Sequence, residues 1–301
     1  MFELKDEKIA IPVVLFAGLL WSFGPLVVRY MDQPGLVPWQ YIFARGLTIF
    51  IVLNLYLYFE EGKNFLKNYL KVGVSGLIGG CGLGVAMITF IYSITNTSAA
   101  VTLLCLAAMP FFTALLGFLF LKERISFNVW IAIFIATIGI IIIALGNTEK
   151  NSLIGLIFGM TSSIGFSIFS VTLRWRKETP KFTTVAIAGL FCVIVALTFI
   201  AINESTILST SYNGGMFSLH GVLVCLGLIL YSIGSKAIPA AELTLLSLTE
   251  VIGGIFWVWL PLFGINEVPS ANTIIGGFFL FMSIIYYSLT IKTNRRFIAL
   301  N

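Results

Sequence analysis

Charged residues and histidine are scarce in this 301-residue sequence. Asp, Glu, Lys and Arg together form only 10% of the chain, and His220 is its single histidine. A soluble domain needs far more charge to cover its surface, so this composition excludes an ordinary soluble protein. One histidine cannot supply an HExxH metal site, the four cysteines lack metal-ligand spacing, and no Walker A motif is present. We therefore expect no metal, no cofactor and no ATP hydrolysis by this chain.

Long apolar runs are abundant instead. The chain is 58% hydrophobic, and its mean hydropathy is +1.01. A run of about 20 apolar residues is long enough to cross a hydrocarbon core of roughly 30 Å. We predict an all-α integral membrane protein with ten transmembrane helices. The predicted spans cover residues 9–31, 36–59, 70–94, 98–121, 126–146, 151–173, 181–203, 214–236, 240–262 and 270–291.

The basic residues fall almost entirely on one side of these spans. Of the 18 Lys and Arg residues, 15 lie on the side of the N-terminus, whereas Arg29 and Lys150 lie on the other side and Arg45 lies within a span. This asymmetry is the positive-inside pattern and predicts cytoplasmic N- and C-termini. The sequence pI near 9.0 is therefore a sign of topology, and we expect no nucleic-acid partner. The predicted location is the plasma membrane or a bacterial inner membrane.

Two segments of the sequence are almost alike. Tyr92–Ile94 recurs as Tyr231–Ile233 at an offset of 139, and the Ala-Ala pair at Ala99 recurs at Ala240 at an offset of 141. Further matches toward the ends raise the offset to about 145. The chain therefore reads as a tandem duplication.

The duplication predicts two domains of five spans each, residues 1–148 and 149–301. Because five is odd, the second copy enters the membrane from the opposite face, and the repeat is inverted. Inverted repeats are typical of secondary transporters, in which the two halves alternate access to a central site.

Short motifs follow the repeat along the chain. They are LLWSFGPLVVRY in the first span, Ala44-Arg45-Gly46 in the second, YSITNTSAAVTLL, Pro110 and LKERIS in the first half, and SLTEVIGG and NEVPS in the second. In this order the chain resembles the ten-helix EamA-type transporters of the drug/metabolite transporter superfamily. The resemblance covers nearly the whole chain and implies export of a small polar or amphipathic metabolite, above all an amino acid or a relative. The chain has Glu250-Val251 where the resemblance leads us to expect Glu-Pro. Because the proline is absent, we do not expect a proline kink in the ninth span.

Three charged residues lie deep in spans, and such residues are costly and usually functional. They are Arg45, Glu242 and Glu250. We predict that Glu250 binds a substrate ammonium or takes up a proton. The alternative is a structural pair with Arg45, whose flexible stem also allows it to reach the outer interface. Two carboxylates against one guanidinium favour a zwitterionic or cationic substrate over an anion, and an amine or quaternary ammonium compound is the alternative cargo.

Aromatic residues add further candidates for substrate binding. We select Trp21 and Tyr92, which could stack on an apolar or cationic substrate. Tyr92 and Tyr231 are equivalent in the repeat and lie near opposite ends of their helices, so they are predicted as gates. The alternative is membership of the aromatic belts at the membrane interfaces.

Helix breaks are predicted near mid-membrane in two spans, at Gly24-Pro25 in the first and at Pro110 in the fourth. Proline frees a backbone carbonyl, which must then face protein or water. These breaks are predicted hinges, with simple packing kinks as the alternative. Gly76, Gly80 and Gly84 recur every four residues and predict a helix face that a neighbour approaches closely.

Other classes of function fit the sequence less well. Gly73–Gly76 matches the Gly-x-Ser-Gly motif of intramembrane serine proteases, but Ser75 and His220 lie on opposite sides of the predicted membrane, about 10 Å apart along its normal. We therefore expect no enzyme and no catalytic residue. The spans also lack the ring of repeated acidic residues found in channels. The expected partners are the small-molecule substrate, the lipid bilayer and, as one candidate coupling ion, the proton, and a monomer is compatible with this function.

Overall fold

The computed structural model describes residues 6–97, 99–122, 125–146, 153–176, 178–265, 268 and 271–298. All regular secondary structure in these ranges is helical, so the predicted all-α class is confirmed. The predicted boundary between residues 148 and 149 lies outside the described residues. The helices are α1 (Glu7–Tyr30), η1 (Pro34–Leu36), α2 (Pro38–Glu61), η2 (Gly62–Phe65), α3 (Leu66–Lys71), α4 (Gly73–Asn96), α5 (Ala99–Leu106), α6 (Met109–Leu116), η3 (Gly117–Leu121), α7 (Phe127–Gly146), α8 (Leu153–Trp175), α9 (Lys181–Ile202), α10 (Ser211–Gly234), α11 (Ala240–Leu246), α12 (Thr249–Trp259), η4 (Pro261–Phe263) and α13 (Ala271–Ile298).

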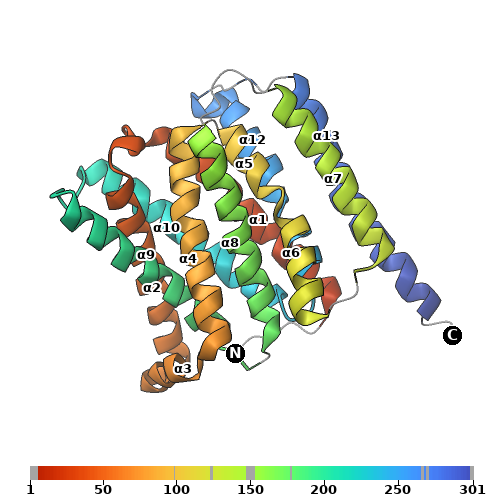
Figure 1. The fold of residues 1–301 in the computed structure, drawn as a ribbon, viewed down its shortest axis with the longest axis horizontal. Helices are drawn as coiled ribbons and strands as arrows, with labels where there is room; N and C mark the ends of the chain where they lie inside the picture. The colour runs from red at the N-terminus through yellow and green to blue at the C-terminus, as the bar shows by residue number, and fades with distance from the viewer. Residues whose placement is uncertain are drawn as a thin grey trace.

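Seven helical segments of the described chain are long and apolar enough to cross a membrane. Three shorter apolar helices, Met109–Leu121, Phe127–Ile142 and Ile274–Tyr287, fall within the fourth, fifth and tenth predicted spans. The integral membrane class is therefore confirmed, while the count of ten spans stays a prediction. The helices stand side by side in one bundle, and α1 begins at the same end at which α13 finishes (Figure 1).

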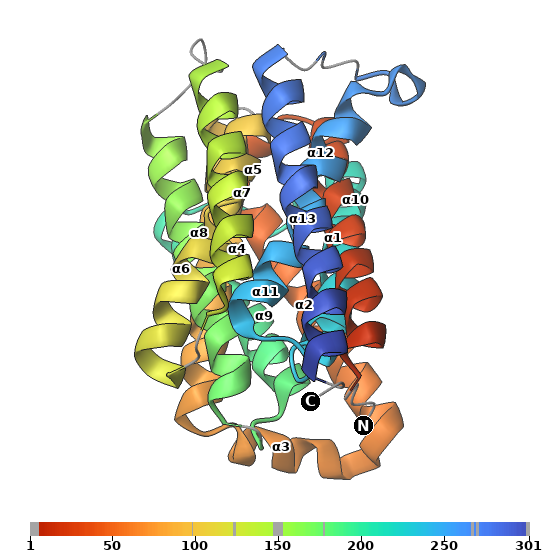
Figure 2. The ribbon, with the colours of Figure 1, turned by 90° about the vertical axis from the view of Figure 1, so that its right-hand side faces the viewer.

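The helix contacts repeat between the two halves of the chain. Helix α1 packs against α10 and α12, and its counterpart α8 packs against α4, α5 and α6. Helices α2 and α9 pack against each other, as do α7 and α13, which lie side by side at one flank of the bundle (Figures 1 and 2). A two-fold axis between the halves would produce these contacts. Rotation about it would place α2 on α9 and α7 on α13, so each helix would pack against its own counterpart.

Glycines allow α4 and α9 to approach closely. A Cβ atom added at Gly80 would lie 2.7 Å from Ile187 Cγ2, and one at Gly84 would lie 2.5 Å from Phe191 Cδ1. These glycines and Gly76 share one helix face that packs on α9. The close approach predicted from their spacing is confirmed.

The fourth predicted span is interrupted just before Pro110. Helix α5 ends at Leu106 and α6 begins at Met109. Serines of α8 bind the backbone around the interruption, since Ser163 donates a hydrogen bond of 2.5 Å to the carbonyl of Cys105 and Ser167 one of 3.1 Å to that of Met109. Hydroxyl groups of a neighbouring helix thus add hydrogen bonds to the backbone on both sides of the interruption.

The ninth span is interrupted as well, although it lacks a proline at position 251. Helix α11 ends at Leu246 and α12 begins at Thr249. The amide of Leu248 binds the carbonyl of Leu245 at 3.2 Å, three residues back, which tightens the turn. Hydroxyl groups stabilise it, because Ser247 donates to the carbonyl of Thr244 at 2.7 Å and Thr249 to that of Leu15 in α1 at 3.3 Å. The sequence missed this break because its stabilising contacts are partly tertiary.

The first span is not interrupted where a break was predicted. Helix α1 runs without a gap from Glu7 to Tyr30 and contains both Gly24 and Pro25. The prediction of a helix break at these residues is therefore wrong. A Cβ at Gly24 would lie 2.8 Å from Nε2 of His220, so α10 approaches closely here.

Candidate functional site

A cavity of about 60 Å³ lies between the two halves of the bundle. Its polar and charged lining residues are Trp21, Arg45, Ser162, His220 and Glu250, and the remaining lining residues are apolar. These side chains come from α1, α2, α8, α10 and α12, so both halves of the chain contribute. Three of them, Trp21, Arg45 and Glu250, are residues that the sequence singled out.

Arg45 lies in α2 and is 5% exposed. Its guanidinium carbon lies 5.6 Å from the centre of the Phe90 ring. Within the described residues, Nε and Nη1 of Arg45 are buried without a hydrogen-bond partner. The expectation that its stem allows it to reach the outer interface is wrong, because Arg45 borders the central cavity. A buried charge without hydrogen bonds is costly, which makes Arg45 a candidate ligand group.

Glu250 lies in the first turn of α12 and borders the same cavity. The break at Ser247 and Leu248 is what places Glu250 at a helix start. Negative charge is favourable at a helix start because the positive end of the helix dipole lies there. Arg45 and Glu250 thus present opposite charges to one small space.

The sequence repeat indicates that these charges are not part of the duplicated scaffold. At the offset of 141 that relates Ala99 to Ala240, Glu250 corresponds to Met109, which also lines the cavity. Glycines of α2 and α9 contact each other, since a Cβ at Gly189 would lie 2.8 Å from the Gly46 carbonyl. If Gly46 and Gly189 are equivalent in the repeat, the preceding residues Arg45 and Ala188 are equivalent too. Each charge therefore has an apolar counterpart, as expected for a site built on a symmetric framework.

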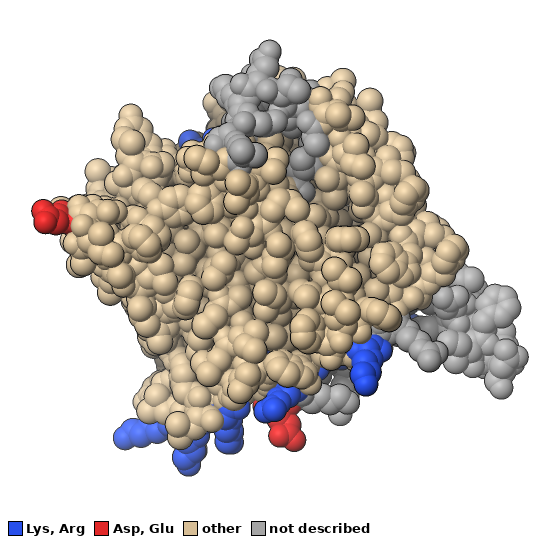
Figure 3. Space-filling model, viewed as in Figure 1, with Lys and Arg blue, Asp and Glu red and all other residues tan. Residues whose placement is uncertain are grey.

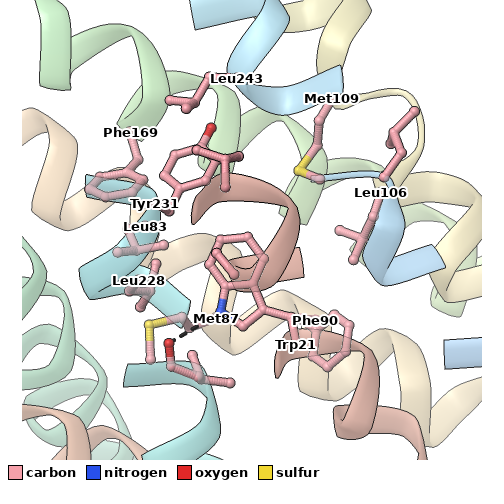
Figure 4. Close-up of a cluster of buried hydrophobic side chains, with 14 of the residues drawn as sticks. Trp21, Leu83, Met87, Phe90, Leu106, Met109, Phe169, Leu228, Tyr231 and Leu243 are labelled. Carbon is pink, nitrogen blue, oxygen red and sulfur yellow. Dashed lines mark hydrogen bonds between the residues drawn. The ribbon is translucent and has the colours of Figure 1, made fainter. Parts of the chain in front are cut away.

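Trp21 forms part of the cavity wall and connects α1 to α10. Its indole N–H donates a hydrogen bond of 3.2 Å to the carbonyl of Val224, the dashed line in Figure 4. A Cβ at Gly227 would lie 2.1 Å from this nitrogen, so the glycine makes room for the indole. Phe166, its counterpart at an offset of 145, meets it edge to face at 5.5 Å. The two halves thus contribute an aromatic pair to the cavity.

Tyr231 lies next to the cavity but is not among its described lining residues. Its side chain is fully buried, its hydroxyl lies 2.7 Å from Oγ of Ser170, and its ring packs on Trp21 at 5.4 Å and on Phe169 at 6.3 Å (Figure 4). Tyr231 therefore packs against aromatic rings of both halves of the chain beside the cavity. Its role as a gate stays a prediction.

Tyr92 lies at the other end of the bundle, near the end of α4. Its ring is partly exposed and contacts Trp39 and Phe158, each at 5.2 Å. It is likewise absent from the described cavity lining. The two equivalent tyrosines thus occupy opposite ends of the bundle, one partly exposed and one buried.

Glu242 is also absent from the described lining of the cavity. It lies in the first turn of α11, and one of its carboxylate oxygens accepts a hydrogen bond from the hydroxyl of Tyr287 in α13. The excess negative charge expected from the sequence is therefore not found in the cavity. Of the described carboxylates, only Glu250 lines it, together with the one guanidinium of Arg45. The sequence could not show this, because it does not tell which face of a helix meets the cavity.

His220 also lines the cavity and was not predicted as a site residue from the sequence. It is 2% exposed, and its Nδ1 pairs with the hydroxyl of Tyr41. A lone ionisable residue inside a predicted span is itself a functional signal. From the sequence, His220 was weighed only as a partner for Ser75, whose hydroxyl instead lies 2.6 Å from that of Thr179. The serine–histidine pair of a protease is not formed in the described part of the chain.

Comparisons with known proteins agree with this arrangement. Residues 8–145 match the EamA-like transporter family. An uncharacterized transporter of Helicobacter pylori strain J99 is 28% identical over 54% of this chain and 52% of its own length, so the chain spans about half the length of that relative. The pseudopaline exporter CntI of Pseudomonas aeruginosa is 26% identical over 68% of this chain and 72% of its own.

A solved crystal structure has the same fold. It superposes with a TM-score of 0.73 over 96% of this chain and 99% of the other, at 17% sequence identity. The family match begins in α1 and ends in α7, and it includes Trp21 and Arg45. Residues 8–145 thus resemble the EamA-like transporter family, and the fold over 96% of the chain is that of a solved structure.

Proposed function

We propose that this protein is a secondary transporter that exports a small zwitterionic metabolite, an amino acid or a relative of one, by alternating access. The observation that carries the proposal is the cavity between the two halves, where Arg45 and Glu250 present opposite charges. Matching charges on a zwitterion would neutralise both groups. The family match supports transport, and the relative named as an exporter supports the outward direction.

The size of the cavity supports a change of conformation during transport. A space of about 60 Å³ holds a few water molecules at most. A metabolite would fit only if the helices around the cavity move apart. The packed halves and the interrupted helices α5–α6 and α11–α12 offer such movement.

The charge distribution supports the proposed orientation in a cell membrane. Lys and Arg side chains gather at the lower end of the bundle, the end at which α3 lies (Figures 1 and 3). By the positive-inside rule this end faces the cytoplasm. Both chain termini would then be cytoplasmic, with the bundle spanning a plasma or inner membrane.

The test is counterflow in liposomes. Purified protein is reconstituted into vesicles loaded with an unlabelled mixture of amino acids, and entry of the same mixture at trace level with label is followed. Exchange requires no known coupling ion. We expect label to accumulate above protein-free vesicles, and omission of single components identifies the cargo. Absence of accumulation for every amino acid would contradict the amino-acid assignment.

A second candidate cargo is an amine or quaternary ammonium compound. The aromatic rings of Trp21, Phe90 and Phe166 line the cavity together with Glu250, and aromatic faces with a carboxylate bind such cations. Arg45 weighs against this alternative because it repels a cation. Counterflow with choline or a primary amine in place of the amino acids separates the two.

A further inference from the structure

We infer that Arg45 is a carboxylate-binding subsite, so that the protein carries only substrates with a free carboxylate. The inference rests on the proposed transport function and narrows its substrate class. It excludes the amines and quaternary ammonium compounds of the second candidate.

The hydrogen bonding of Arg45 differs from that of a structural arginine in the same protein. Arg174 donates from Nη1 to the carbonyls of Ser235 and Ile238 at 3.0 and 2.6 Å. Arg45 is only 5% exposed, yet its Nε and Nη1 atoms have no hydrogen-bond acceptor among the described residues. A guanidinium has five N–H donors and cannot lose its proton. The N–H groups on Nε and Nη1 therefore lack an acceptor within the described chain.

The geometry of the guanidinium selects the kind of acceptor. Two parallel N–H groups of a guanidinium, one on Nη2 and the other on Nε or Nη1, match a carboxylate or a phosphate through two hydrogen bonds. Glu250 lines the same cavity and would repel the second negative charge of a phosphate. A single carboxylate, balanced by an ammonium facing Glu250, leaves the cavity neutral.

The remaining residues of the cavity wall indicate that the ligand has an apolar side chain. Besides the residues that carry charge or hydrogen bonds, the lining consists of aromatic and aliphatic groups such as Phe90, Phe166, Met87, Leu106 and Leu228. Burial of apolar surface there would stabilise the complex without further polar partners. The ligand class is therefore an α-amino acid with an apolar side chain.

Matched ligand sets test the subsite on the unmodified protein. Leucine is compared with isoamylamine, which lacks the carboxylate, and with 4-methylpentanoate, which lacks the ammonium. Phenylalanine, phenethylamine and 3-phenylpropionate form a second set, and inorganic phosphate is a further probe. Binding is measured as the shift of the melting temperature of the purified protein in detergent. We expect at least one amino acid to bind tenfold or more tightly than its amine.

Equal binding of an amine and its amino acid would overturn the subsite. So would a rise of the melting temperature with phosphate alone, or the lack of any rise with every carboxylate compound. Arg45→Gln is expected to lose the amino-acid shift and Arg45→Lys to keep part of it. The exposed Arg176 is the matched control, and Arg176→Gln should bind as the unmodified protein does. Retention of full binding by Arg45→Gln would also contradict the inference.

The same measurements separate the subsite from transport. Binding that depends on Arg45, without counterflow, would leave the subsite standing and contradict the transport proposal. Counterflow that accepts amines as well as amino acids would leave transport standing and remove the subsite.

Discussion

Glu250 and Glu242 lie eight positions apart and differ in their surroundings. Glu250 borders the cavity at the start of α12, whereas Glu242 accepts a hydrogen bond from Tyr287 and is not a described lining residue. Both attract attention in the sequence for the same reason, the cost of an acidic group inside a span. Of the two carboxylates, only Glu250 borders the cavity.

We predict that Glu250→Gln lowers counterflow at least tenfold or removes its pH dependence while the protein remains folded. Truncating one partner of a buried charge pair costs about 2 kcal/mol or more, which is at least tenfold in binding. The measurement is the initial counterflow rate between pH 5.5 and 8.5. Glu242→Gln is the matched control and should keep its pH profile. Full activity of Glu250→Gln with an unchanged profile would remove Glu250 from the site.

At the scale of elements, the connector between α10 and α11 is held by two basic side chains. Besides the bonds from Arg174 of α8, Lys181 of α9 donates to Oγ of Ser235 at 2.5 Å. The connector lies at the basic end, beyond the buried Tyr231. Release of these bonds would be needed for the connector to move away from α8 and α9.

We predict that Lys181→Met speeds exchange of backbone amide hydrogens in residues 235–238 by about tenfold or more. Hydrogen bonds to charged groups contribute about 1.5–3 kcal/mol, and methionine keeps the apolar stem while losing the donor. Mass spectrometry of the reconstituted protein measures the exchange. The exposed Lys67 provides the control variant Lys67→Met, which should leave this segment unchanged. Unaltered exchange in Lys181→Met would show that the connector does not depend on this bond.

Element boundaries were predictable where hydropathy alone defines them. Each predicted span overlaps an apolar helix, because long apolar runs must lie in lipid or protein. The interruptions were less predictable. Pro110 indicates a break through its missing N–H, but the break before Thr249 depends on a bond to Leu15 of another helix. Pro25 shows the converse, since α1 continues through it.

At the scale of the whole molecule, the two equivalent tyrosines differ in exposure. Tyr231 is fully buried at the basic end, whereas Tyr92 is partly exposed at the opposite end. An inverted repeat would exchange these two environments when the protein changes state. The two tyrosines therefore provide a probe of such an exchange.

We predict that substrate changes the labelling of Tyr92→Cys and Tyr231→Cys in opposite directions. The measurement is the rate of reaction with a membrane-impermeant thiol reagent, in a background in which Cys81 is replaced by alanine. Cys81 is the one partly exposed cysteine, the other three being buried. Leu70→Cys, on the exposed α3, serves as a control with constant labelling. Parallel changes at both tyrosine positions would argue against alternating access.

The sequence by itself determined the membrane class, the approximate spans, the basic end and two of the charged residues that line the cavity. Each of these follows from the cost of placing charge or unsatisfied backbone in lipid, which acts on residues one at a time or along one helix. Tertiary structure alone decided that His220 joins Arg45 and Glu250, that Glu242 does not, and that Tyr231 is buried. These outcomes depend on how helices from distant parts of the chain rotate and pack, because a cavity is enclosed only by several helices together.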